Sequence, residues 1–415
     1  MDSNKHAGDL DDSFGKGGIV EPPDTVNTFG HVINVLVSSE EKIFIIGELA
    51  RHYSIVSLNK DGSMNSDFNN GKIIKDIFKA GFLSAASEIK LTQDNNILIA
   101  GTYEETEIIN YHALALYKQD GSLSANFGQG GKIIIYLPAE AGKYASPPKI
   151  IPLPDKKILA VSTRQANYRS IAVLYRLEQN GEIDNTFGDK GYIDISYRKR
   201  ETSAQSMLRQ PDGKLLIAGM VRVDSEYGSY VGFVARFNSD GTPDTSFAEE
   251  GYFVNTKTYG FEQITSIELL LHGKIVATGN ASSDKKMTGL LLCLTTEGKL
   301  DPMFNGGKPI YTTLDSQNTE LFFSNVCVQS DKKIVVQGGT PGAENADIIL
   351  ARYLSTGRLD DTFGQAGWVR TKVGKSVDIG RGMALQRDER IVVGGSYSID
   401  GTLDGLRQLA LRYLK

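Results

Sequence analysis

The sequence predicts an all-β protein, a seven-bladed β-propeller made of four-stranded antiparallel blades. Three observations carry this prediction. One short phrase recurs seven times, each period contains about four strand-like segments, and the two ends of the chain hold complementary parts of one period. A repeat fold accommodates 415 residues in one body, so we expect residues 1–415 to form a single propeller domain.

The recurring phrase has phenylalanine near its centre, as in LDDSFGKGG, IDNTFGDKG and PDTSFAEEG. Its seven copies place phenylalanine at Phe14, Phe68, Phe127, Phe187, Phe247, Phe304 and Phe363. By subtraction, the successive gaps are 54, 59, 60, 60, 57 and 59 residues. A nearly constant period of this length indicates a repeat architecture.

Each period supplies the strands of one blade. A turn followed by a β-branched run recurs seven times, as in KIFIIG, KLLIAG and RIVVGG, and alternating segments such as GFVARFNSDG follow it. With VINVLV, KIFIIG, YSIVSL and GKGGIV as strands a to d, a blade becomes an antiparallel meander. Both faces of a blade pack against neighbouring blades, which explains why several strands are apolar almost throughout.

The two termini predict that the ring closes. The chain begins with AGDLDDSFGKGGIV, the last quarter of a period, and ends with LRQLALRYLK, the third quarter. We therefore expect the strand within residues 8–20 to complete the last blade and remove an open sheet edge. An open solenoid would instead carry polar caps at both ends.

The combined consensus, roughly QPDGKIVVAG followed by ARYxxxGxLDxxFGxxG, resembles the bacterial delta-sixty repeat family. The closest copy in this chain comprises Gln210, Pro211, Asp212, Gly213, Lys214 and residues 215–219, then Ala235, Arg236, Phe237, Asp244 and Phe247. The resemblance covers nearly the whole chain. It implies a propeller-like β fold and does not imply any general biochemical activity.

Charged residues recur together in four copies. Arginine lies five residues before the turn glycine, and aspartate lies three residues before the phenylalanine; the pairs are Arg176 with Asp184, Arg236 with Asp244, Arg352 with Asp360, and Arg412 with Asp11. Two copies replace both residues, with Ser57 and Asn65 or with Leu116 and Ser124, and the fifth has Cys293 with Asp301. We interpret the recurring pair as a structural ion pair, because either charge alone is poorly tolerated at an apolar sheet edge.

Composition argues against several classes of partner. The formal net charge is −5, so the chain lacks the positive field of a nucleic-acid binder. The N-terminus does not resemble a signal peptide, and no segment is apolar enough to span a membrane. We expect a soluble, monomeric ring, cytoplasmic by default, with export without a cleavable signal left open. We expect the two cysteines, Cys293 and Cys327, to be buried thiols.

No motif assigns a catalytic residue, a metal or a cofactor. The Asp-Gly turns lack the ligand spacing of an EF-hand, and the five histidines lack metal-ligand spacing. No G-x-S-x-G elbow is present. At the channel, the inner strands offer Asn34, Glu88, Lys149, Ser206, Ser266, Asn325 and Gly382. This ring has one acid and a lysine, which makes a poor divalent-cation site.

Ligand binding is expected on one face of the ring. In a meander, the b–c and d–a connections emerge on one rim, and these segments vary in length and composition here, whereas the a–b and c–d turns are regular. The candidate ligand-binding residues on this irregular face are Tyr103, Tyr111, Tyr168, Arg198, Tyr227 and Tyr230. Tyrosine suits protein and sugar ligands equally. We expect a non-enzymatic scaffold that binds a protein or carbohydrate. A hydrolase or lyase with its site at the channel mouth, and a component of a larger exported complex, are the alternatives.

Overall fold

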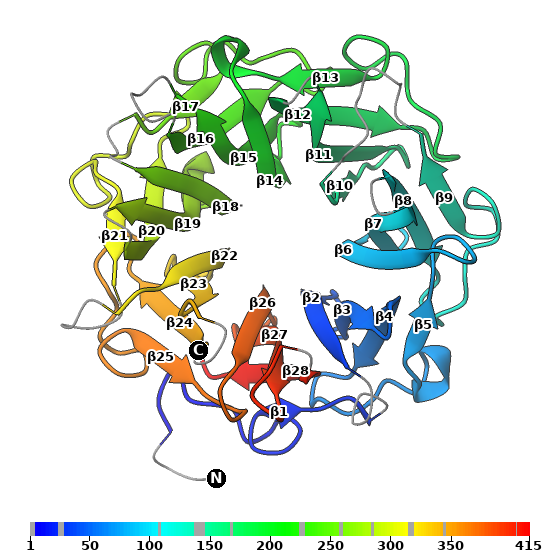
Figure 1. Ribbon diagram of the computed structural model, residues 1–415. Helices are drawn as coiled ribbons and strands as arrows, with labels where there is room; N and C mark the ends of the chain where they lie inside the picture. The colour runs from blue at the N-terminus through cyan, green and yellow to red at the C-terminus, as the bar shows by residue number, and fades with distance from the viewer. Residues whose placement is uncertain are drawn as a thin grey trace.

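The computed structural model describes residues 5–23, 29–106, 109–136, 146–166, 169–223, 229–256, 260–283, 286–313, 319–342, 346–403 and 405–415. These residues form seven four-stranded antiparallel sheets around a central axis, so the fold is a seven-bladed β-propeller, as predicted (Figure 1). Short 3-10 helices at Asn69–Gly71, Tyr197–Lys199 and Leu271–Gly273 lie in the connections. No helix in the described part of the chain has the length and apolar character needed to cross a membrane.

Each blade is a meander whose strands a, b, c and d follow one another outward from the axis (Figure 1). Blades 1 to 3 consist of β2 (Gly30–Val37), β3 (Ile43–Leu49), β4 (His52–Leu58) and β5 (Ile74–Asp76); β6 (Leu83–Leu91), β7 (Ile97–Thr106), β8 (Ile109–Tyr117) and β9 (Lys132–Ile135); and β10 (Lys149–Pro152), β11 (Ile158–Ala166), β12 (Arg169–Leu177) and β13 (Tyr192–Ile195).

The remaining four blades repeat this order. They consist of β14 (Thr202–Arg209), β15 (Leu215–Arg222), β16 (Tyr230–Phe237) and β17 (Tyr252–Val254); β18 (Phe261–Leu269), β19 (Ile275–Ser283), β20 (Lys286–Leu294) and β21 (Ile310–Thr312); β22 (Phe322–Val328), β23 (Ile334–Gly339), β24 (Ile348–Tyr353) and β25 (Trp368–Thr371); and β26 (Asp378–Leu385), β27 (Ile391–Ser398), β28 (Leu406–Tyr413) and β1 (Ile19–Val20).

Blade 7 takes its outer strand from the N-terminal segment, which confirms the predicted closure. In β1, Ile19 lies opposite Leu411 and Val20 lies opposite Ala410. Leu10 forms a further antiparallel bridge with Tyr413. The strand itself is therefore shorter than the predicted segment 8–20, and backbone hydrogen bonds between residues 8–11 and 412–414 hold the chain before it. The ring has no open edge at this seam.

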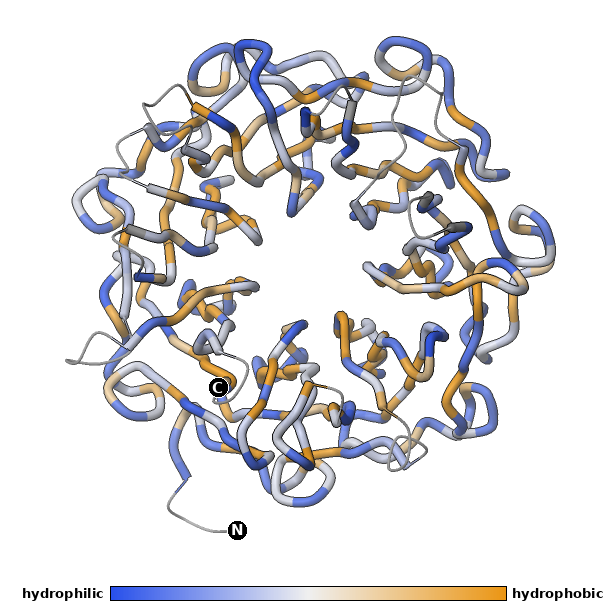
Figure 2. Tube along the Cα trace, viewed as in Figure 1, coloured by the Kyte–Doolittle hydropathy of each residue, from blue (hydrophilic) through white to orange (hydrophobic). Residues whose placement is uncertain are grey.

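The hydrophobic core lies between the blades. Strands b and c are buried along almost their whole length, as in β15 and β16 of blade 4. Side chains of neighbouring blades mix in one cluster, for example Phe187 of the repeat phrase after β12 with Phe233 in β16. Figure 2 shows hydrophobic residues along the strands and hydrophilic residues in the outer turns. Burial on both faces accounts for the continuous apolar runs in the sequence.

The repeat glycine and the repeat phenylalanine meet across a blade boundary. Gly241, in the c–d turn of blade 4, has φ of 92°, and a Cβ atom there would lie 2.9 Å from the Phe187 ring of blade 3. Gly298 of blade 5 lies in the same way against Phe247, at 2.7 Å. A side chain at either glycine would meet both a strained backbone and an aromatic ring. This contact explains why turn glycine and phenylalanine recur together.

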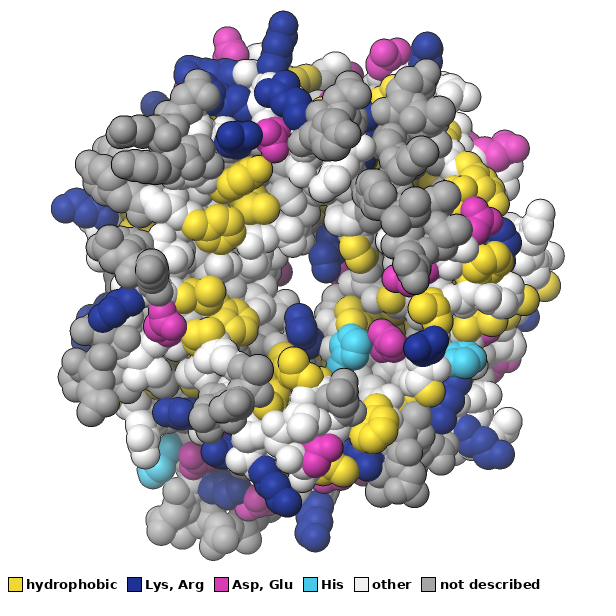
Figure 3. Space-filling model, viewed as in Figure 1, with side chains coloured by type: hydrophobic (Ala, Val, Ile, Leu, Met, Phe, Trp, Pro, Cys, Tyr) yellow, Lys and Arg dark blue, Asp and Glu magenta, His cyan; other side chains and the backbone are white. Residues whose placement is uncertain are grey.

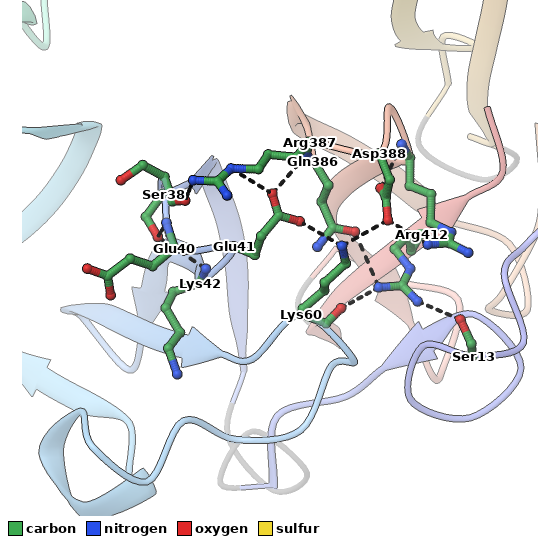
Figure 4. Close-up of polar contacts among 12 residues, drawn as sticks. Ser13, Ser38, Glu40, Glu41, Lys42, Lys60, Gln386, Arg387, Asp388 and Arg412 are labelled. Atoms are coloured by element: carbon green, nitrogen blue, oxygen red, sulfur yellow. Dashed lines mark hydrogen bonds and ion pairs between the residues drawn. The ribbon is translucent and has the colours of Figure 1, made fainter.

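The repeated arginine and aspartate lie in contact in four blades. The distances from arginine Nε to aspartate Oδ2 are 2.5 Å for Arg176–Asp184, 2.7 Å for Arg236–Asp244 and Arg352–Asp360, and 2.9 Å for Arg412–Asp11. Each guanidinium also lies 4.6 or 4.7 Å from the centre of the repeat phenylalanine ring. At the seam, Arg412 of blade 7 donates to the Lys60 carbonyl of blade 1 and to the Ser13 hydroxyl (Figure 4).

A turn lysine, which the sequence prediction left out, reaches the same carboxylates. Lys214 Nζ lies 2.8 Å from Asp244 Oδ2, so this oxygen accepts from two cations. In blade 5, where Cys293 stands at the arginine position, Lys274 Nζ lies 2.6 Å from Asp301 Oδ2. The lysine therefore explains why the fifth copy keeps its aspartate without an arginine.

Candidate functional site

Polar side chains reach the central channel because strand a is bulged. In six blades the pairing of strand a with strand b shifts by one residue, and in five of them the residue that follows the extra one lines the central channel. The residues that follow the extra one in the six blades are Asn34, Glu88, Ser206, Ser266, Asn325 and Gly382, which are members of the predicted inner ring. Lys149, at the start of β10, supplies the seventh member.

The channel contains a cavity of about 340 Å³, lined by the ring residues other than Gly382. Figure 3 shows the hollow at the centre of the molecule. Glu88 is buried and lies 2.9 Å from Lys90 Nζ and 3.2 Å from Lys149 Nζ. Burial alone would raise the pKa of Glu88, but the charges of the two lysines lower it. Glu88 is therefore held as a carboxylate within a paired cluster.

Glu268 is the second acid of the channel. It belongs to β18 and lines the same cavity as Lys90. Burial raises its pKa, and this effect outweighs the hydrogen bond from the Leu269 amide and the charge of Lys90. The channel thus holds one acid whose pKa is lowered and one whose pKa is raised. Within the described residues, no group of three or more His, Cys, Asp or Glu side chains is placed to hold a metal ion.

Three tyrosines form a stack on the irregular face of blade 2. Tyr103, in β7, and Tyr111, in β8, have ring centres 5.2 Å apart and nearly parallel planes, at 19°. Tyr136, directly after β9, contacts Tyr111 edge-on, also at 5.2 Å. Tyr103 is fully buried, Tyr111 is half-buried, and Tyr136 is 61% exposed. We call these three residues the tyrosine stack; its outer end is presented to solvent.

Charged and apolar residues surround the tyrosine stack. Lys79 Nζ lies 5.1 Å from the ring centres of both Phe82 and Tyr103, within cation–π range, and 3.5 Å from Glu105 Oε1. Leu83, which directly follows Phe82, is 40% exposed. On the side of blade 2 in Figure 3, hydrophobic side chains gather with acidic and basic ones between them. The surface therefore combines flat aromatic contacts with one cation and one anion.

The remaining predicted ligand-binding residues lie elsewhere. The Tyr230 hydroxyl donates to Glu201 Oε2 at 3.1 Å, on blade 4. Arg198, between blades 3 and 4, forms an ion pair with Glu249. Tyr168 and Tyr227 lie outside the described residues. Among the six residues, the structure brings Tyr103 and Tyr111 together and places Tyr230 and Arg198 in separate polar clusters.

Tyr136 and Lys79 belong to the tyrosine stack and its rim, but sequence reasoning did not select them. Tyr136 follows the strand KIII directly, so its place at the end of strand d on the irregular rim is a signal that was available. Lys79 lies in the d–a connection between blades 1 and 2. Tyr103 was selected as a ligand contact, whereas its complete burial makes it a support for Tyr111.

Three segments of the chain match a family model described as "Domain of unknown function (DUF5122) beta-propeller", at residues 153–187, 210–247 and 329–363. Each segment ends at a repeat phenylalanine, and the second is the closest copy of the consensus described above. The match supports a β-propeller family. No curated protein sequence matches the chain.

Solved structures of similar shape include polysaccharide lyases. An ulvan lyase of family PL25, solved bound to -[GlcA(1-4)Rha3S]-, has a TM-score of 0.52 and 11% identity, over 97% of this chain and 94% of that chain. The polysaccharide lyase Uly1 has a TM-score of 0.51 and 10% identity, over 100% and 93%. A protein of unknown function from Dyadobacter fermentans has a TM-score of 0.47 and 12% identity, over 82% and 97%. At these identities the likeness concerns the fold alone.

Proposed function

We propose that this propeller is a non-enzymatic binding scaffold that recognises a protein or carbohydrate through its irregular face. The observation that carries the proposal is the tyrosine stack, in which the exposed Tyr136 is held by Tyr111 over the buried Tyr103. A rigid aromatic surface on a closed scaffold provides contact area with little loss of conformational entropy on binding. We expect ligand contact at Tyr136 and Tyr111.

The surroundings of the tyrosine stack suit a ligand with both apolar and polar groups. Tyrosine rings supply flat contact surface, and their hydroxyls supply donors and acceptors. Lys79 and Glu105 provide one charge of each sign at the edge of the stack. The blades beneath are held by buried strands, so the loops can vary without loss of the ring.

Binding to surface-bound polysaccharides and to candidate partner proteins tests this proposal. We expect Tyr136→Ala and Tyr111→Ala to weaken binding by about 10-fold or more, since buried aromatic anchors contribute about 2 kcal/mol or more. Leu403→Ala is the matched control, because Leu403 is an exposed apolar residue on the same rim of blade 7. Ligand affinity that is unchanged by both tyrosine substitutions would contradict the proposal.

A hydrolase or lyase with its site in the channel is the second candidate. Glu268, whose pKa is raised by burial, is a candidate proton donor, and Lys90 and Lys149 are candidates to bind an anionic substrate. Two proteins of similar shape are polysaccharide lyases, which makes acidic polysaccharides the first substrates to try. Glycan cleavage by the wild type that Glu268→Gln lowers by 100-fold or more, about the contribution of one general acid, would favour this candidate.

A further inference from the structure

A pocket of about 280 Å³ lies between blades 1 and 2, on the rim of the a–b and c–d turns. Lys42 lines it from the a–b turn of blade 1, and Asn65 and Asp67 line it from the segment before the repeat phenylalanine. Gln119 lines it from the c–d turn of blade 2. This rim is opposite to the one with the tyrosine stack, so the pocket is separate from the proposed recognition surface.

In blade 4, an arginine fills the corresponding space. Arg236 Nε donates to Asp244 Oδ2 at 2.7 Å, and Nη2 donates to Ser246 Oγ at 3.4 Å. Nη1 donates at 2.6 Å to the carbonyl of Thr296, in the c–d turn of the next blade. The guanidinium lies 4.6 Å from the centre of the Phe247 ring. The repeat itself therefore shows which group this space holds.

Blade 1 has no arginine at this position, but it has polar residues at the positions that contact the guanidinium in blade 4. Ser57 stands at the arginine position and is buried, and its hydroxyl accepts at 3.0 Å from Nδ2 of Asn65, which lines the pocket. Asp67 stands where blade 4 has the serine that meets the guanidinium, and Gln119 stands where blade 4 has the acceptor carbonyl. Phe44, which pairs with Ser57 across the sheet, lines the pocket with an aromatic ring.

We propose that this pocket binds the guanidinium group of an arginine side chain presented by a partner protein. Asp67 offers a carboxylate, which a forked guanidinium can engage through two parallel hydrogen bonds. Phe44 contributes part of a largely buried aromatic ring to the lining, and the Gln119 side chain offers an amide oxygen. The partner's arginine thus replaces the one that the repeat supplies internally in four other blades.

The charges around the pocket favour a cation. Glu40, Asp67 and Asp120 line it together with a single lysine, Lys42. The Lys42 ammonium donates at 2.7 Å to Asn59 Oδ1 and at 3.3 Å to Asn65 Oδ1. In blade 4 a turn lysine and the arginine share one carboxylate, so a lysine beside a guanidinium is compatible with this arrangement. A guanidinium forms planar forked contacts that an ammonium does not.

Titration of 15N-labelled protein with N-acetyl-Gly-Arg-Gly-amide tests the proposal directly. We expect saturable shifts of the backbone amides of Asn65, Asp67 and Gln119. The same peptide with lysine should bind at least 10-fold more weakly, and the peptide with neutral citrulline should produce no saturable shift. These two peptides separate guanidinium recognition from general attraction of cations and from side-chain shape.

Two substitutions test whether the arginine peptide binds in this pocket. Ser57→Arg should fill the pocket from within, and Asp67→Asn should remove its carboxylate; each should weaken binding of the arginine peptide at least 10-fold. Asp67 lies at the surface, so its variant should fold normally even if Ser57→Arg does not. Asp240→Asn is the matched control, since Asp240 is the blade 4 counterpart of Asp120, and its binding should equal that of the wild type.

The proposal is overturned by any of the following four results. The arginine peptide gives no saturable shift, the citrulline peptide binds as tightly, or both pocket variants bind like the wild type. Equal weakening by Asp240→Asn also overturns it. Because the pocket and the tyrosine stack lie on opposite rims, substitutions at Tyr136 should leave this binding unchanged, which separates the two proposals.

Discussion

Replacing Asp244 by alanine tests whether the repeated ion pair supports the ring. The Asp244 side chain is 8% exposed and accepts from Arg236 Nε at 2.7 Å and Lys214 Nζ at 2.8 Å. The amide and hydroxyl of Ser246 donate to its other oxygen, at 3.1 and 2.6 Å. Its removal leaves Arg236, with 9% of its side chain exposed, without a carboxylate. Breaking a buried pair costs about 3–5 kcal/mol, and we expect about 3 kcal/mol because Lys214 can turn to water.

Asp301→Ala is the matched control, because blade 5 has no arginine at this position. There, only Lys274 loses its carboxylate, and its side chain is 32% exposed. An exposed cation is readily rehydrated, so we expect a loss of about 1 kcal/mol. Urea unfolding, followed by circular dichroism and by the fluorescence of the single tryptophan, Trp368, measures both variants.

The difference between the two variants carries the test. If Asp244→Ala changes the free energy of unfolding by less than about 0.5 kcal/mol, the pair does not stabilise the ring. If Asp301→Ala costs as much as Asp244→Ala, the loss arises from the turn that the aspartate caps, and the arginine contributes nothing of its own.

Three further predictions concern pH and closure. Burial raises the pKa of Glu262 from 4.5 to about 7, so the free energy of unfolding should fall by about 3 kcal/mol as pH rises from 4.5 to 8, and Glu262→Gln should remove this dependence in urea titrations. Burial alone would raise the pKa of Asp360, but hydrogen bonds from Thr362 and nearby cations lower it from 3.8 to about 2. The free energy of unfolding should therefore fall as pH is lowered from about 4 to about 2, and it should fall less in Asp360→Asn. Cysteines at Val20 and Ala410, which lie opposite each other, should form a disulfide that raises the free energy of unfolding by about 4 kcal/mol, whereas failure to cross-link would contradict the pairing of β1 with β28.

The fold followed from the sequence because each period carries its own signals. The phenylalanine phrase and the β-branched run fix the strand order, and the split repeat predicts that the N-terminal strand closes blade 7. Most of the inner ring also followed, since six of the seven residues expected at the channel line its cavity and five of these six follow a bulge. Both features arise from local patterns that recur, so each copy supports the others.

The surface sites were harder to predict because they depend on contacts between blades. The burial of Tyr103 and the exposure of Tyr136 are set by how three strands and a neighbouring connection pack, which no single repeat encodes. The pocket beside Asp67 lies in a blade without the repeat arginine, and its relation to that arginine appears only when blade 1 is compared with blade 4. The turn lysine was missed because its carboxylate lies 30 residues further along the chain.

The pairing of the N-terminal segment with the last blade has a consequence for the order of folding. Asp11 and Arg412 are 401 positions apart, so their contact requires almost the entire polypeptide. On a ribosome, the segment around Asp11 emerges 401 residues ahead of Arg412, its partner in β28. Six blades consist of strands consecutive in the chain, whereas the seventh cannot be completed before β28 has been synthesised. Long-range pairing of this kind is slow, so we expect ring closure to be the rate-limiting event.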